Sequence, residues 1–241
     1  FKNVPAVRQA FYDLHRTKRA LQTCAPARIF RQKHNPKGFL PERELAVVSC
    51  FFNPSGSLRR VRNFQVFLAA MRASGVHCLV VELAFGDNEF TIVDHPDVIQ
   101  LRTNHVLWHK ERLLNIGIRQ LLSEGYRKIA WLDGDIVFED PHWPTEIANR
   151  LEHANLCQVF STIAIHPHEN GPPMVGYSAV RYFREFGRLY AQPARKGRNL
   201  LGGVIHGGRS GFGWGARAEV LEKIMLFDSA KGVPLAMIEG S

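Results

Sequence analysis

A short acidic turn between two apolar runs, close to residue 130, constrains the fold of this chain most. Residues 129–132 (Ile-Ala-Trp-Leu) carry no charge, as is typical of a strand that is buried on both faces of a sheet. Asp133-Gly134-Asp135 interrupts the apolar run, Ile-Val-Phe resumes it at 136–138, and Asp140-Pro141 adds a turn signal. This pattern predicts two apolar strands joined by an acidic turn.

The two carboxylates of that turn suggest a metal site. Burying Asp133 and Asp135 is costly unless they are paired or bind a cation, and Gly134 lets a ligand or the backbone approach closely. A surface turn is the alternative, because Asp and Gly are common in turns. Oxygen ligands suit Mn²⁺ or Mg²⁺, and open α/β sheets bind ligands at the carboxyl ends of their strands. We therefore predict Mn²⁺ or Mg²⁺ here.

Strand and helix patterns alternate ahead of the acidic turn. Strands are expected at 45–52, 77–83 and 98–101, and helices between Ser57 and Gly75 and over 107–122. This order predicts parallel strands with crossover helices in an α/β domain. The chain has no Gly-x-Gly-x-x-Gly motif and no P-loop, which disfavours a dinucleotide or ATP site of those kinds.

The second half of the chain has a less regular pattern. Helices are expected over 145–154, 178–190 and 216–226, and a strand over 157–163. Residues 202–215 hold seven glycines around one His and one Trp. Because glycine allows close approaches and the apolar residues there argue against a flexible linker, this segment is predicted to be a substrate-facing loop.

The formal net charge of +9 over 241 residues favours anionic partners: nucleotides, nucleic acid or an acidic membrane surface. Residues 5–22 read as a basic amphipathic helix that packs on the domain or makes peripheral membrane contact, and residues 24–44 read as a connector. The four cysteines form no Cys-x-x-Cys pair, so zinc is disfavoured, and free thiols favour a reducing compartment. With no visible signal peptide or membrane-length apolar run, the expected location is cytoplasmic, with a peripheral position on the inner membrane face as an option.

Four segments resemble glycosyltransferases of the GT-A fold, close to the family 2-like and β-1,4-galactosyltransferase-like groups. They are VVSCFFN at 47–53, VVELAFGD at 80–87, HKERLLNIG at 109–117 and LDGDI at 132–136. The resemblance covers residues 45–228 and implies a Rossmann-like mixed sheet flanked by helices. It implies a basic N-terminal helix and connector (1–44) before a catalytic domain (45–241), with a nucleotide-binding half (45–140) and an acceptor-side half (141–241).

The same resemblance implies an activity and a set of donor contacts. The enzyme would move a sugar from a nucleotide-diphosphate donor, first of all a UDP-sugar, to a hydroxyl of a glycan or glycoconjugate, with inversion. Phe51 and Asn53 would border the uracil and ribose, and Glu82 would hold the nucleoside. Lys110 or Arg112 would approach the diphosphate.

The resemblance also implies roles around the metal. Asp135 would ligate Mn²⁺ or Mg²⁺, Asp133 would touch the ribose or a metal-bound water, and His206 is a candidate third ligand. Asn115 and Gly134 join the expected nucleotide-sugar contacts.

Two features of the family concern the end of the chain. The segment from Gly211 to Trp214 resembles the loop that lines the acceptor and the donor sugar, which makes Trp214 a sugar contact. The family places an acidic catalytic base after this region. Glu239 is the candidate here, unless the base lies beyond Ser241. A second alignment sets Gly213-Trp-Gly215 on the family's Trp-Gly-Gly-Glu-Asp, with Ala and Arg then replacing the two acids.

Two other functions remain open from the sequence. A nucleotidyltransferase acting on sugar phosphates uses a similar sheet and metal, but the loop after the first strand, at 53–60, carries only part of the Gly-rich basic signature. A non-enzymatic nucleic-acid binder would account for the basic charge. That alternative has no recognisable binding motif and leaves Asp133 and Asp135 unexplained, so no nucleic-acid partner is expected.

Overall fold

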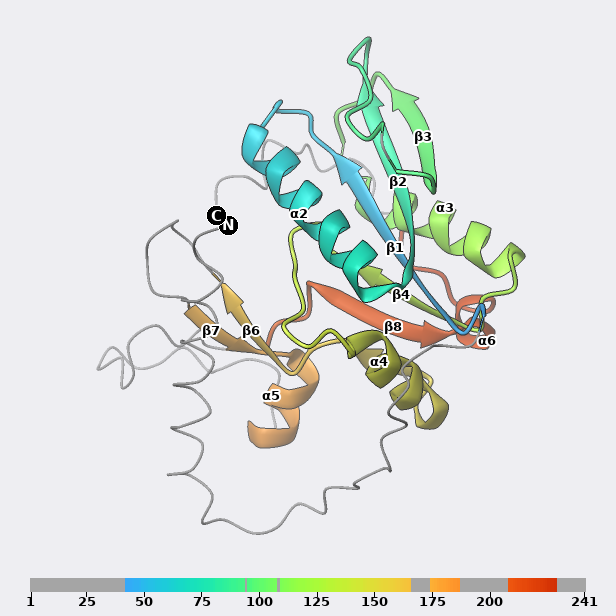
Figure 1. Cartoon of the computed structure of the whole chain (residues 1–241), viewed down its shortest axis with the longest axis vertical. Helices are drawn as coiled ribbons and strands as arrows, with labels where there is room; N and C mark the ends of the chain where they lie inside the picture. Colours follow the sequence, from blue (N-terminus) through green and yellow to red (C-terminus); the bar gives the residue numbers. More distant parts are fainter. Residues whose placement is uncertain (1–41, 94, 108, 166–173, 187–207, 229–241) are drawn as a thin grey trace.

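The structure is a computed structural model, and it describes residues 42–93, 95–107, 109–165, 174–186 and 208–228 (Figure 1). The expected helix at 5–22, nearly all of the connector, and the site candidates His206 and Glu239 lie outside these residues. In the described part, no helix is long and apolar enough to cross a membrane.

A mixed sheet with the strand order β3-β2-β1-β4-β8-β5 forms the centre of the described fold. Its four parallel strands are β1 (Leu45–Phe52), β2 (His77–Phe85), β3 (Val98–Thr103) and β4 (Lys128–Leu132). β8 (Gly213–Arg217) runs antiparallel to β4 and to β5 (Leu156–Gln158). A separate antiparallel pair joins β6 (Thr162–Ile165) to β7 (Met174–Tyr177). The predicted α/β class with a mixed, helix-flanked sheet is confirmed.

The described residues form five helices: α2 (Leu58–Ser74), α3 (Lys110–Ser123), α4 (Trp143–His153), α5 (Ala179–Phe186) and α6 (Ala218–Leu221). The local sequence explains where α2 begins and ends. The Ser57 hydroxyl accepts a hydrogen bond from the Arg60 backbone N–H, and Gly75 takes the left-handed conformation (φ 68°) that stops the helix. The crossover helix between β1 and β2 lies where the sequence predicts it.

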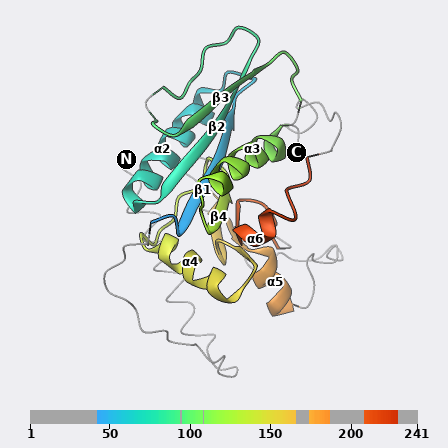
Figure 2. The same cartoon turned by 90° about the vertical axis from the view of Figure 1, so that its right-hand side faces the viewer.

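The two faces of the sheet have separate apolar cores, because side chains alternate along each strand. Val47 and Val80 pack toward α2 and α4, whereas Val48 and Val81 pack toward α3 and α6. Figure 2 shows α2 and α3 on opposite sides of the sheet. α3 lies very close to β1, since a Cβ on Gly117 would be 2.4 Å from Cγ2 of Val48.

Two predicted strands are wrong. Residues 136–138 do not form a strand; Ile136 and Phe138 instead pack half-buried on the core, and the Phe138 ring stacks on Trp143 at 4.1 Å. The expected strand over 157–163 is split between β5 and β6, which belong to different sheets. Ile136 and Phe138 are thus held by tertiary packing rather than by strand pairing, whereas Cys157 pairs with Gly215 and Ile163 with Gly176 in two different sheets.

The Gly-rich segment also differs from its prediction. Gly213 and Trp214 lie in β8, an interior strand of the sheet, and not in a loop. The glycine is needed there, because a Cβ at Gly213 would be 2.7 Å from side-chain atoms of Leu132 and Val159. The helix expected over 216–226 is only the short α6, and the chain beyond it is irregular.

Candidate active site

The carboxyl ends of β1 and β4 form a topological switch point, the usual ligand site of an open α/β sheet. From β1 the chain proceeds to β2 and β3 on one side, and β4 then pairs with β1 on the other side. Backbone pairing of β1 with β4 ends at Val48–Trp131, and beyond it the Ser49 hydroxyl donates to the Leu132 carbonyl over 2.8 Å. The Asp133-Gly-Asp135 turn follows β4 directly at this edge.

Asp133 is held at the edge by an ion pair with Lys110, the first residue of α3. Lys110 Nζ donates to Asp133 Oδ1 over 2.5 Å, and the two side chains are 25% and 28% exposed. Burial acts to lower the pKa of Lys110, but the Asp133 carboxylate and its hydrogen bond outweigh burial, and the pKa is raised. The Asp133 backbone N–H also donates to the Phe212 carbonyl over 2.9 Å. Asp133 therefore joins α3, β4 and the entry to β8.

Asp133 is paired with a lysine, whereas the environment of Asp135 disfavours its ionised form. Its residue is exposed overall, yet protein atoms crowd the carboxyl, and this partial burial together with the nearby Asp133 raises its pKa above the ordinary value of 3.8. Lys110 and Arg60 act in the other direction but do not cancel the increase. The negative charge of Asp133 disfavours ionisation of Asp135. A bound cation would offset this repulsion between the two carboxylates.

The raised pKa of Asp135 gives a prediction about pH. A divalent cation needs the ionised carboxylate, so metal affinity should fall as pH drops through the raised pKa, earlier than an ordinary Asp would allow. The effect of pH on folding stability has the opposite direction. A carboxyl whose pKa is raised in the folded state stabilises that state at low pH, and this contribution is lost as pH rises. Mn²⁺ titrations followed by calorimetry across the acid range test this. An Mn²⁺ affinity that stays constant until the pH falls to the ordinary pKa of Asp would contradict this prediction.

The donor set fits Mn²⁺ or Mg²⁺ if substrate phosphates complete the coordination. Among the described residues, no group of three or more His, Cys, Asp or Glu side chains is placed to hold a metal. Asp133 and Asp135 supply two carboxylates, and Mg²⁺ sites of this kind use one or two carboxylates with phosphate oxygens and water. His206 lies outside the described residues, so a third protein ligand stays a prediction.

Two basic side chains, together with Glu111 in the first turn of α3, accompany the acidic turn at this edge of the sheet. Lys110 comes from the first turn of α3 and Arg60 from the first turn of α2, whose charge acts on Asp135. The first turn of α2 contains no acidic residue. A helix N-terminus carries a partial positive charge, so the two basic side chains and the helix ends together favour an anionic ligand.

Phe51 and Glu82, two expected nucleoside contacts, are buried with protein partners. Phe51 is 6% exposed, and its ring lies 4.8 Å from that of Phe64. Glu82 is 2% exposed, and its carboxylate accepts hydrogen bonds from the Thr91 N–H over 2.6 Å and the Ile92 N–H over 3.2 Å. The structure thus places Phe51 in the core and Glu82 as the anchor of the loop after β2.

Asn53 and Gly134 also have structural roles. The Asn53 amide donates to the Ser57 carbonyl and accepts from the Ser57 N–H, over 3.1 and 2.9 Å, and so closes the loop before α2. A Cβ on Gly134 would lie 2.3 Å from the ring of Phe64, so the glycine lets the acidic turn pack against α2. Arg112 is exposed on α3. Of the predicted residues, the structure brings together Lys110, Asp133, Gly134 and Asp135.

Trp214 and Asn115 make hydrogen bonds within the protein. Trp214 faces Trp131 in the β4–β8 pairing, and its indole N–H donates to the Ser210 carbonyl over 2.7 Å. Asn115 is buried on α3, where it binds the segment after α6. Ser49, which hydrogen-bonds to β4, was not among the predicted site residues, because its only signal in the sequence is a hydroxyl in an otherwise apolar strand.

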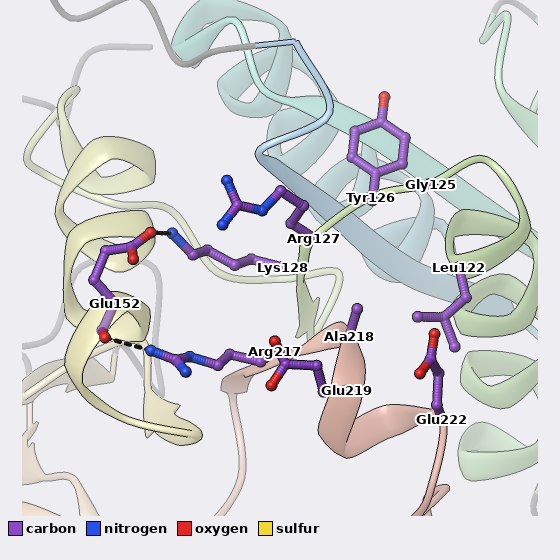
Figure 3. A pocket seen from close by; sticks show the side chains of 10 residues that line it. All are labelled: Leu122, Gly125, Tyr126, Arg127, Lys128, Glu152, Arg217, Ala218, Glu219 and Glu222. Atoms are coloured by element: carbon purple, nitrogen blue, oxygen red, sulfur yellow. Dashed lines mark hydrogen bonds and ion pairs between the residues drawn. The ribbon is translucent and has the colours of Figure 1, made fainter.

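A pocket of about 310 Å³ lies at the opposite edge of the sheet, where β4 begins (Figure 3). The Lys128 ammonium contacts the carboxylates of Glu44 and Glu152, and the Arg217 guanidinium contacts the Glu152 carbonyl, as Figure 3 shows for the two Glu152 contacts. These charged groups are paired within the protein. The pocket lies at the amino end of β4, far along the strand from Asp133, and is therefore separate from the acidic turn.

No protein-family model and no curated protein matches this chain. Among solved structures, a chain described as a nucleotide-diphospho-sugar transferase from Desulfovibrio desulfuricans is similar with a TM-score of 0.33 and 10% identity, over 48% of this chain and 57% of that one. The UDP-glucose pyrophosphorylase from Leishmania major is similar with a TM-score of 0.33 and 10% identity, over 74% of this chain and 51% of that one. This chain therefore spans little more than half of either. Such low scores carry no functional argument.

Proposed function

We propose that this chain is a metal-dependent glycosyltransferase that moves a sugar from a nucleoside-diphosphate donor, a UDP-sugar in the first instance, to a hydroxyl of a glycan or glycoconjugate. The observation that supports this proposal most strongly is the acidic pair Asp133 and Asp135 at the β1–β4 switch point, with Lys110 and Arg60 beside it. This arrangement combines carboxylates for a dication with fixed positive charge for phosphates.

The proposed chemistry follows from the charges of the site. As the bond between the sugar and the diphosphate breaks, negative charge gathers on the leaving phosphate. A cation held by Asp133 and Asp135 would supply electrostatic stabilisation of that charge. Lys110 adds a positive charge that its ion pair with Asp133 keeps in place. We further propose inversion at the anomeric carbon, with Glu239 or a later acid as the base that takes the acceptor proton.

Calorimetric binding tests the proposal. UDP, GDP, CDP and TDP are titrated into the wild-type protein with and without Mn²⁺. We expect one nucleoside diphosphate, UDP first, to bind only when the metal is present. Absence of binding, or binding that is indifferent to Mn²⁺, would defeat the glycosyltransferase proposal.

The same titrations separate the two alternative functions. A nucleotidyltransferase acting on sugar phosphates would bind UTP more tightly than UDP and would release pyrophosphate when a sugar 1-phosphate is added. A nucleic-acid binder would bind an oligonucleotide with a steep dependence on salt and without any need for Asp135. Metal-dependent UDP binding without either behaviour supports the transferase.

A further inference from the structure

The charged side chains of α2 are all positive. The helix carries four arginines and no Asp or Glu, and the stretch from residue 45 to residue 81 contains no acidic residue at all. Arg60 and Arg72 act on titratable groups elsewhere in the protein. Arg59 and Arg62 are exposed, and neither has a hydrogen-bond or ion-pair partner among the described residues. Their positive charge is therefore available to a partner.

The same side of α2 exposes two large apolar side chains. Leu58 is 72% exposed and Val66 is 50% exposed. Residues three or four positions apart are neighbours on the surface of a helix, so Arg62 lies between Leu58 and Val66 and beside Arg59. We call these four residues the outer face of α2. It combines arginines with apolar side chains and includes no carboxylate.

The outer face of α2 points away from the sheet. Phe64, Phe67 and Met71 are buried and pack the other side of the helix on the core. Figure 2 shows α2 on the opposite side of the sheet from α3, at the outside of the described fold. The acidic turn packs against the same helix, since a Cβ on Gly134 would be 2.3 Å from the Phe64 ring. A partner on the outer face would thus lie beside the candidate active site.

We propose that the outer face of α2 is a docking surface for a membrane that contains anionic phospholipids. Arg59 and Arg62 bind the anionic headgroups, while Leu58 and Val66 enter the boundary between headgroups and acyl chains. Nucleic acid would also attract the arginines, but its phosphate backbone offers no apolar layer for the Leu and Val side chains. The mixture of charge and apolar surface therefore favours a bilayer. This proposal does not rest on the transferase function.

Co-sedimentation of the full chain with lipid vesicles tests the electrostatic part. The vesicles contain phosphatidylcholine alone, or phosphatidylcholine with about one quarter phosphatidylserine. We expect the wild type to bind the anionic vesicles more tightly than the neutral ones, and less tightly as salt is added. Arg59→Gln/Arg62→Gln should lower the affinity for anionic vesicles roughly 30-fold, since each arginine near such a surface contributes roughly fivefold.

A matched double variant controls for net charge. Arg119→Gln/Lys223→Gln removes the same charge from exposed positions on α3 and after α6, helices that pack on the other face of the sheet. It should change the vesicle affinity by less than about threefold, because salt screens charges that distant from the membrane. The basic residues before residue 42 are present in both double variants, so they do not account for a difference between them.

The apolar side chains separate a membrane from nucleic acid. Leu58→Ser/Val66→Ser should lower the affinity for anionic vesicles roughly 10-fold, because less apolar surface leaves water on binding. The same variant should leave any binding of a DNA oligonucleotide unchanged. Urea unfolding should show stabilities close to that of the wild type for all these variants, since every substituted side chain is exposed.

Three results would overturn the proposal. The first is wild-type protein that does not bind anionic vesicles. The second is an equal loss of vesicle affinity in Arg59→Gln/Arg62→Gln and in Arg119→Gln/Lys223→Gln, which would assign the binding to net charge. The third is vesicle affinity that is indifferent to Leu58→Ser/Val66→Ser, together with oligonucleotide binding that depends on Arg59 and Arg62. A failure of the UDP titrations would leave this inference standing.

Discussion

Replacing Asp135 with asparagine should weaken Mn²⁺-dependent UDP binding by roughly 100-fold or more, because changes to groups that only support a metal ligand already cost 10- to 100-fold. Asparagine keeps the shape of the side chain but removes the charge that attracts the dication. The pKa of Asp135 is raised in the folded protein by partial burial and by Asp133, so its ionised form is disfavoured there. The stability of the ligand-free variant at neutral pH should therefore be unchanged or slightly higher.

A matched control makes the Asp135 experiment specific. Glu139→Gln removes the same kind of charge from an exposed position four residues along the chain and should leave UDP affinity unchanged. Calorimetry with and without Mn²⁺ gives the affinities, and urea unfolding gives the free energies of unfolding. Equal UDP affinity in Asp135→Asn and Glu139→Gln would show that the acidic turn is structural.

Replacing Lys128 with methionine should lower the free energy of unfolding by about 3–5 kcal/mol, the usual cost of removing one partner of a buried ion pair. The Lys128 and Glu44 side chains are only 4% and 9% exposed, and their charged groups are in direct contact. Methionine fills the space of the lysine stem but leaves the Glu44 carboxylate buried. Glu152, the other partner of Lys128, is exposed and keeps its hydration.

The neighbouring Arg127 provides the control for Lys128. It pairs with the same Glu44 carboxylate over 3.3 Å, but its side chain is 70% exposed, so Arg127→Met should cost at most about 1 kcal/mol. Urea unfolding measures both variants. Since these residues lie at the amino end of β4, UDP affinity of folded Lys128→Met should equal that of the wild type. Equal losses of stability for the two variants would contradict the buried-pair explanation.

The sequence determined the first half of the fold well. β1, β2, β3 and their crossover helices lie where apolar periodicity and Gly75 indicate, because these elements are specified by residues close together in the chain. The acidic turn after a buried strand likewise pointed to Asp133 and Asp135. Signals of this kind are local, so they can be read before the tertiary structure is known.

Residues whose role depends on a distant partner could not be assigned in this way. Glu82 read as a nucleoside contact, but the backbone of the loop at 91–92 takes its carboxylate. Asn115 read as a sugar contact, but its partners lie 111 and 113 residues later. A polar side chain on a buried element signals that some hydrogen-bond partner is present without telling which one.

The second half of the chain shows the same limit at the level of whole elements. Gly213 and Gly215 predict a loop by their freedom, yet both lie in β8, where a Cβ on Gly213 would be 2.7 Å from Leu132. The order β4-β8-β5 joins strands that are remote in sequence. The sequence by itself thus determined the α/β class and the acidic pair through local periodicity and the cost of burying charge. Only the tertiary structure decided which of the candidate polar groups have partners within the protein, because burial and long-range hydrogen bonds depend on residues that are distant in the chain.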